Sequence, residues 1–96
     1  MRLYFSPRAT RDLSSIFLYL DARSKGGARN VMRAIHDSIR FIAAHPHGSR
    51  VTDMQGAHTK TVRAYPFRIF YRILEDKNEI EILHIRHASR PPWQGD

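Results

Sequence analysis

The stretch of sequence that decides the fold is YPFRIFYRIL, residues 65–74. From residue 67 onward every second residue is large and apolar, a period of two that is typical of a β-strand. Alternation predicts an inward face of Phe67, Ile69, Tyr71 and Ile73 and an outward face of Arg68, Phe70, Arg72 and Leu74. Interleaved arginine and aromatic side chains suit nucleic acid, through phosphate contacts and base stacking. They also suit an amphipathic partner chain, and the alternative is a set of solvated arginines at the edge of the core.

The residues that follow complete a β-hairpin. Residues 75–78 are polar and have the length of a hairpin turn, and the isoleucine-rich stretch 79–86 predicts the next strand. Ile80 and Ile82 fall on one side of it, and Leu83 and Ile85 on the other. A strand that is apolar on both sides is typical of the centre of a sheet, so we expect its second face to be covered by the tail or by a partner.

Upstream of the hairpin the chain is predicted to be helical. Ser6 and Pro7 have the character of an N-cap and a first helical residue, and apolar residues at helical spacing extend this helix to about Asp21. Residues 24–27 interrupt the pattern, so Gly26 and Gly27 are interpreted as a linker. A second helix is predicted over 28–44, before Pro46. The predicted apolar faces are Ala9, Leu13, Ile16, Phe17 and Leu20 in the first helix, and Ala28, Val31, Ile35, Ser38, Ile39 and Ile42 in the second.

Together these elements predict an α+β fold with the order β-α-α-β-β-β. A helical hairpin at about 7–44 is expected to pack on a mainly antiparallel sheet. The sheet is expected to comprise about 59–86, which includes a strand at 59–63, plus the short strand 2–5. Residues 49–58 are predicted to be a loop, 87–96 an extended tail, and the whole chain 1–96 one domain.

The outward faces of the two helices carry further candidates for binding. In the first helix Leu18 points away from the apolar stripe. In the second, Arg29, Arg33, His36 and Arg40 recur at spacings of four, three and four residues and form one stripe opposite the core. The stripe is either a solvated helix surface or an electrostatic footprint for an acidic protein or for phosphate.

Composition narrows the class of partner and the class of chemistry. Sixteen basic and nine acidic residues give the 96-residue chain a net charge of +7, and most of the cations are arginine. The expected partner is therefore nucleic acid, a ribonucleoprotein or an acidic protein, although a basic domain without an anionic target is the alternative. The absence of cysteine excludes disulfides, thiolate metal sites and a cysteine nucleophile. The longest apolar run is five residues and no secretory signal is apparent, so we expect a cytoplasmic protein without a membrane span.

Six histidines show no metal-binding spacing, so neither a metal site nor a cofactor is predicted. Metal-independent phosphate chemistry would need cations to stabilise the charged transition state and a general acid and base. Arg68, His84, His87 and Arg90 are the candidates, provided that they converge where the last strand ends. The alternative for a histidine at a strand end is a packing or hydrogen-bonding role.

The order and spacing of these pieces resemble the RelE/ParE superfamily of bacterial type II toxin–antitoxin toxins. The resemblance rests on the opening strand with Ser6-Pro7, the pattern of the first helix, residues 46–48, the strand 65–73 and the ending 82–90. It implies a compact toxin that a cognate acidic antitoxin neutralises. RelE-like members cleave mRNA at the ribosome, whereas ParE-like members bind DNA gyrase. The ending 87–90 is closer to the ParE side, whose members are often described as plasmid stabilisation proteins.

Compared residue by residue, the chain has only some of the catalytic residues of the RelE-like nucleases. Arg68 matches the arginine that contacts the scissile phosphate in RelE-like nucleases, and His87 lies where they keep a basic residue. Trp93 stands where the nucleases commonly have a functional tyrosine, and no carboxylate is positioned as a base before Arg68. The leading hypothesis is therefore a ParE-like toxin that acts by binding, with gyrase as its target. A RelE-like ribosome-dependent mRNA endoribonuclease using Arg68, His87 and Arg90 is the alternative, and an inactive relative that still binds antitoxin is a third. The antitoxin or target surface is predicted to contain Arg68, Phe70, Arg72, Leu18, Arg29, Arg33 and Arg40.

Overall fold

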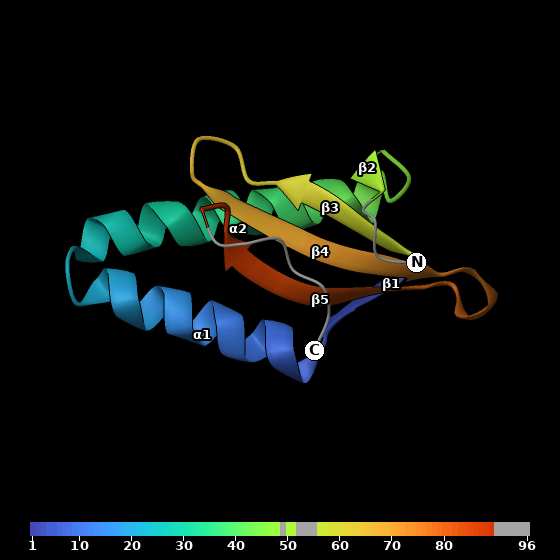
Figure 1. The fold of residues 1–96 in the computed structure, drawn as a ribbon, viewed down its shortest axis with the longest axis horizontal. Coiled ribbons are helices and arrows are strands. Elements are labelled where there is room, and N and C mark those ends of the chain that lie inside the picture. Colours follow the sequence, from blue (N-terminus) through green and yellow to red (C-terminus); the bar gives the residue numbers. More distant parts are fainter. Residues whose placement is uncertain (49, 52–55, 90–96) are drawn as a thin grey trace.

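The computed structural model describes residues 1–48, 50–51 and 56–89, which form two helices and a five-stranded sheet (Figure 1). The elements are β1 (Arg2–Phe5), α1 (Pro7–Asp21), α2 (Lys25–Ala44), β2 (Arg50–Val51), β3 (Ala57–Thr61), β4 (Phe67–Leu74), the 3-10 turn η1 (Glu75–Lys77) and β5 (Glu79–His87). The strand order is β1-β5-β4-β3-β2; β1 and β5 are parallel and the other neighbours are antiparallel. Figure 1 shows α2 behind the sheet and α1 running beside β5. The predicted α+β fold is confirmed.

Both helices begin at a serine cap. The Ser6 Oγ accepts a hydrogen bond from the Ala9 amide at 3.0 Å, and Pro7 opens α1, as predicted. The Ser24 Oγ accepts one from the Gly27 amide at 3.0 Å, so α2 begins at Lys25, three residues before the predicted start. Gly26 and Gly27 therefore lie in the first turn of α2, and their interpretation as a linker is wrong because the serine cap outweighs their low helix propensity.

The core lies between the helices and the sheet. The predicted apolar face of α2 is buried along its whole length, whereas α1 buries only Ala9 fully and leaves Leu13, Ile16 and Leu20 half-buried. Phe17, which its spacing placed in the apolar stripe, is 40% exposed. The sheet contributes Phe67, Ile69, Tyr71, Ile80, Ile82 and Ile85 to the same cluster, and Val62, just after β3, joins them. The thinly covered side of the molecule is therefore α1.

An irregularity between β4 and β5 changes two predictions. Tyr71 pairs with Ile82 and Phe70 with His84, so Leu83 is an extra residue in β5, a β-bulge. Beyond the bulge the alternation is inverted, and Ile85 joins Ile80 and Ile82 in the core cluster instead of facing the other side. The predicted exposure of Phe70 is also wrong, because the side chain is only 8% exposed although it lies outside that cluster.

Several element limits differ from the prediction. The strand predicted at 59–63 lies at Ala57–Thr61, and Arg50–Val51 pairs with it as β2, so 49–58 is not loop throughout. β5 continues through His87, which was assigned to the tail. Arg90 and Trp93 lie outside the described residues. Across the ranges that the structure describes, no helix is long and apolar enough to cross a membrane.

Candidate functional site

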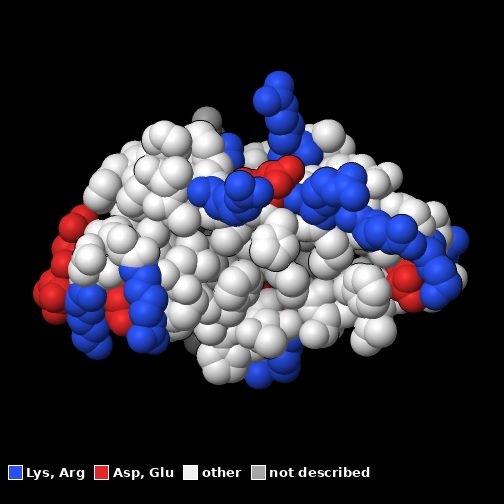
Figure 2. Space-filling model, turned by 180° about the vertical axis from the view of Figure 1, so that it is seen from behind, with Lys and Arg blue, Asp and Glu red and all other residues white. Residues whose placement is uncertain are grey.

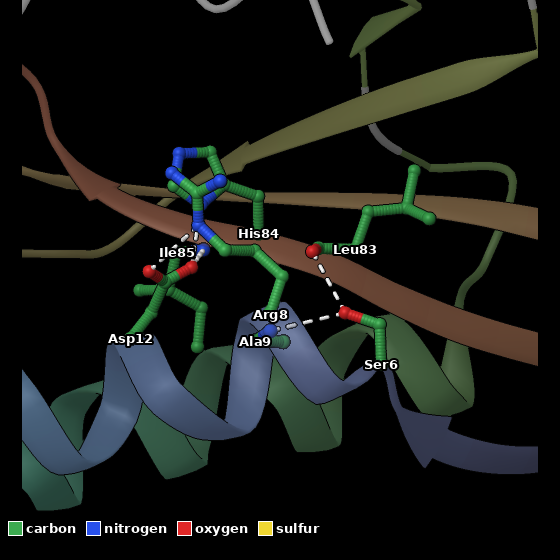
Figure 3. A network of polar contacts seen from close by, with 7 residues as sticks. All are labelled: Ser6, Arg8, Ala9, Asp12, Leu83, His84 and Ile85. Carbon is green, nitrogen blue, oxygen red and sulfur yellow. Dashed lines mark hydrogen bonds and ion pairs between the residues drawn. The ribbon is translucent and has the colours of Figure 1, made fainter. Parts of the chain in front are cut away.

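One acidic side chain joins α1 to the outer half of β5, the part of the strand that follows Ile82 (Figure 3). Asp12 Oδ2 lies 2.5 Å from His84 Nδ1 and accepts a hydrogen bond from the Ile85 amide at 3.0 Å. Asp12 Oδ1 is 3.2 Å from Nε of Arg8, one turn earlier on the same helix. Since the carboxylate is an acceptor, the His84 nitrogen that faces it carries the proton. The network therefore fixes both the position and the tautomer of a buried histidine.

The network replaces a missing strand. β1 pairs with β5 only as far as Ile82, so the following residues of β5 have an unpaired edge on that side. Ser6 Oγ donates to the Leu83 carbonyl at 2.9 Å, and Asp12 accepts from the Ile85 amide. Unsatisfied backbone groups at a buried edge are costly, and these side chains take the role that a neighbouring strand would have.

His84 is neutral in this environment. Burial lowers its pKa below the usual 6.5, and this effect exceeds the opposing influence of the hydrogen bond and charge of Asp12, while Arg8 and Arg86 lower it further. Its ring also stacks with Phe70 at a centroid distance of 6.0 Å. His84, a sequence candidate for acid–base chemistry, is therefore engaged in holding α1 on the sheet.

The lowered pKa of His84 predicts a loss of stability in acid. The unfolded chain takes up this proton near pH 6.5, before the folded chain does, so the contribution of His84 is complete above pH 6.5 and is lost as the pH falls below it. We expect the melting temperature to fall between neutral pH and pH about 5, and to fall less in His84→Gln. The measurement is thermal unfolding followed by circular dichroism across this range. Parallel pH profiles for the two proteins would contradict the assignment.

The outward face of the sheet gathers arginines that sequence analysis did not place together. Arg68 on β4 lies directly opposite Arg86 on β5, and the Arg86 Nε atom is buried with no hydrogen-bond partner among the described residues. Facing like charges are unfavourable, so this pair suits a bound anion. Counting from the Leu74–Glu79 pair, a regular hairpin would place Arg68 opposite Ile85; the extra residue Leu83 brings Arg86 there instead. The alternation of Arg68 was visible in the sequence, but the bulge that selects Arg86 was not.

The other sequence candidates on the sheet do not converge with Arg68. Arg72 forms an ion pair with Glu81 at 2.8 Å. His87 pairs with Phe67 across the strands and packs edge-on against its ring, and its Nδ1 accepts hydrogen bonds from the amide and hydroxyl of Ser89. Because Phe67 faces the core and Arg68 is the next residue, Arg68 and His87 lie on opposite faces of the sheet.

A groove runs between α1 and the outer half of β5 and is closed at one end by the loop before β4. Apolar side chains from α1, α2, β4, β5 and that loop line it, among them Ile16, Leu20, Val31, Tyr65, Phe67 and Ile85. Tyr19 of α1 also lines the groove, and the centre of its ring lies 3.7 Å from the Arg23 guanidinium carbon. Leu18 is 66% exposed, as its position predicts, but it belongs to another side of α1 and does not line the groove. The lining also includes charged side chains, among them Asp12, Arg23 and Arg86.

The predicted stripe on α2 is exposed and forms a second candidate surface. Arg29, Arg33, His36 and Arg40 all lie on the outside of the helix. Figure 2, which views the molecule from the helix side, shows a band of Lys and Arg across this face. In the described part of the chain, no three metal-ligating side chains gather at either surface or elsewhere.

A helical hairpin packed on a mainly antiparallel sheet is the fold that this chain shares with solved proteins of toxin–antitoxin systems. The chain is similar to the chromosomal ParDE toxin–antitoxin system from P. aeruginosa (22% identity, 93% of this chain and 97% of that chain, TM-score 0.70). It is similar to the intact E. coli RelBE toxin-antitoxin complex (15% identity, 93% of this chain and 98% of that chain, TM-score 0.70). It is also similar to a YoeB/ParE toxin from Agrobacterium tumefaciens (19% identity, 91% of this chain and 98% of that chain, TM-score 0.64). No curated protein matches the sequence. Residues 3–92 match the family described as ParE toxin of type II toxin-antitoxin system, parDE, and the chain belongs to this family.

Proposed function

We propose that this toxin acts by binding DNA gyrase and not by cutting RNA. The observation that carries the proposal is the separation of Arg68 from His87, the two groups that a nuclease would use together, on opposite faces of the sheet. The neighbours of Arg68 across the strands are Thr61 and Arg86, neither of which is a general base. The buried, neutral His84 serves the fold. A target-binding toxin needs none of this chemistry.

A cognate acidic antitoxin is the proposed partner, and the groove beside α1 is its proposed site. The apolar side chains that line the groove, among them Ile16 and Leu20, offer the anchors on which protein interfaces depend. The net charge of +7 attracts an acidic chain. Phe70, which the sequence placed on the antitoxin surface, is buried, so the proposed site moves from the sheet face to α1.

Inhibition of gyrase is the expected result of adding the purified chain to a supercoiling assay. In growing cells, pulse labelling after induction should show that DNA synthesis stops before protein synthesis, and co-expression of the adjacent antitoxin gene should restore growth. Arg68→Ala should change neither result, because a binding toxin does not require this cation. Undisturbed supercoiling at a large molar excess of toxin over gyrase would reject the proposal.

The facing pair Arg68 and Arg86 favours a second candidate, a ribosome-dependent mRNA endoribonuclease. Two cations with a buried, unpartnered Nε are suited to stabilising a phosphate that gains charge in the transition state. Primer extension on mRNA after induction tests this candidate. It requires cleavage that Arg68→Ala and Arg86→Ala each abolish, while the matched exposed substitution Arg63→Ala leaves it intact.

A further inference from the structure

The outward face of α2 is a straight row of cations. Arg29, Arg33, His36 and Arg40 occupy successive turns, and the three arginines span about 16 Å along the helix axis at 1.5 Å per residue. In Figure 2 a band of basic side chains follows this face, with acidic atoms between two of its basic groups. A rigid 20-residue helix thus presents guanidinium groups at fixed intervals.

The three arginines of the row differ from other cations of the molecule in their ion pairs. Arg8, Arg72 and Lys25 each lie within 4.0 Å of a carboxylate. By contrast, none of Arg29, Arg33 and Arg40 forms an ion pair with any residue in the described ranges, although Asp37 is on the same helix. The positive potential of the row therefore acts outward, where it attracts a polyanion.

The chemistry of the row favours nucleic acid over protein. The centres of protein interfaces are depleted of charge and rich in large apolar anchors. Among the described residues, α1 exposes three such side chains, Phe17, Leu18 and Tyr19, whereas α2 exposes Phe41. The exposed aromatic residue near the end of the row is Phe41, and Lys60 lies over its ring at 4.4 Å. A single strand would need large aromatic platforms between the cations for its bases to stack on, and between Arg29 and Arg40 the row offers only the imidazole of His36.

We propose that the outward face of α2 binds the phosphate backbone of double-stranded DNA without reading its sequence. Guanidinium groups bind phosphate oxygens in a bidentate manner, and the wide major groove of B-form DNA admits a helix. The major groove of A-form RNA is too narrow for side chains to enter, so the fit is to DNA. This contact goes beyond the proposed binding of gyrase, and it brings the toxin to the DNA on which a DNA-acting target works.

Fluorescence anisotropy with a labelled DNA duplex of about 20 base pairs, two helical turns, tests the proposal with the full chain and no gyrase. The parent should bind with a dissociation constant within the range of about 10⁻⁴–10⁻⁶ M that is typical of non-specific binding. Arg29→Gln/Arg33→Gln/Arg40→Gln should weaken binding by about 10²-fold at 0.1 M salt. It should also reduce the slope of log affinity against log salt by about 2.7, or 0.9 for each lost phosphate contact. Glutamine keeps the helix propensity, and circular dichroism checks the fold.

The matched control is Arg11→Gln/Arg63→Gln/Lys77→Gln, which removes the same charge from exposed positions in α1, the loop before β4 and η1. It should keep most of the affinity, since charges more than a Debye length of about 10 Å from the duplex are screened. Equal losses in the two triple variants would overturn the proposal, because binding would then follow net charge alone. Equal or tighter binding to an RNA duplex, or to a polyglutamate peptide, through the same three arginines would overturn it as well. Gyrase inhibition is measured separately, so either proposal can fail alone.

Discussion

Replacing Asp12 with alanine is expected to lower the free energy of unfolding by about 2–4 kcal/mol. The carboxylate accepts from the Ile85 amide and from His84, and both donors stay in place when it is removed. A buried donor without a partner costs about 1–3 kcal/mol, and the Asp12 side chain supports two of them. A domain of this size is stable by only about 5–15 kcal/mol, so the loss is a large share of the total. Chemical denaturation monitored by circular dichroism measures it.

Asp12→Asn is the matched control, because the amide oxygen can still accept one of these hydrogen bonds while the charge is lost. We expect it to lie between the wild type and Asp12→Ala. Arg8→Gln, which removes the more exposed partner of Asp12, should cost about 1 kcal/mol or less. If Asp12→Ala unfolds at the same denaturant concentration as Arg8→Gln, the carboxylate does not hold α1 on β5.

Local chemistry made most of the fold predictable. Ser6 and Pro7 mark a helix start through capping and fixed backbone geometry, and the alternation around Ile69 marks a strand regardless of its neighbours. Ser24 marked the start of α2 equally well, but the two glycines after it obscured the signal. In each case the signal, a serine cap or an alternation of apolar residues, lies within four residues of the helix start or strand that it predicts.

The candidate site was less predictable because it depends on contacts between distant residues. The bulge at Leu83 inverts the faces of β5, and this one residue decides that Ile85 is core and that Arg86 meets Arg68. Asp12 and His84 are 72 positions apart in the sequence, and no periodic pattern predicts that they pair. The stripe on α2 could be predicted, since it requires only helical spacing. A surface on a single helix or strand can thus be predicted from the sequence. A site between two strands can be predicted only when the pairing register of the strands is known.

Tyr71→Ala is expected to have the largest effect on stability, about 3–5 kcal/mol, as for other large buried aromatic side chains. Tyr71 is fully buried in the middle of β4, and its ring stacks on His58 of β3 at a centroid distance of 5.2 Å. Its hydroxyl donates to the Pro46 carbonyl at 2.6 Å, just after the end of α2. The side chain therefore fastens the helix that carries the basic stripe to the centre of the sheet. Thermal and urea unfolding measure the loss.

Tyr71→Phe separates the hydroxyl from the ring. It keeps the packing and leaves the Pro46 carbonyl without its donor, so we expect a loss of about 1–2 kcal/mol. Tyr71→Phe also tests whether DNA binding depends on the stability of the fold or on the exposed arginines of α2. Tyr71→Phe should bind DNA like the parent, because the arginines of α2 remain in place, although its midpoint of unfolding is lower. A Tyr71→Phe protein as unstable as Tyr71→Ala would mean that the hydroxyl, and not the packing of the ring, anchors the end of α2 to the sheet.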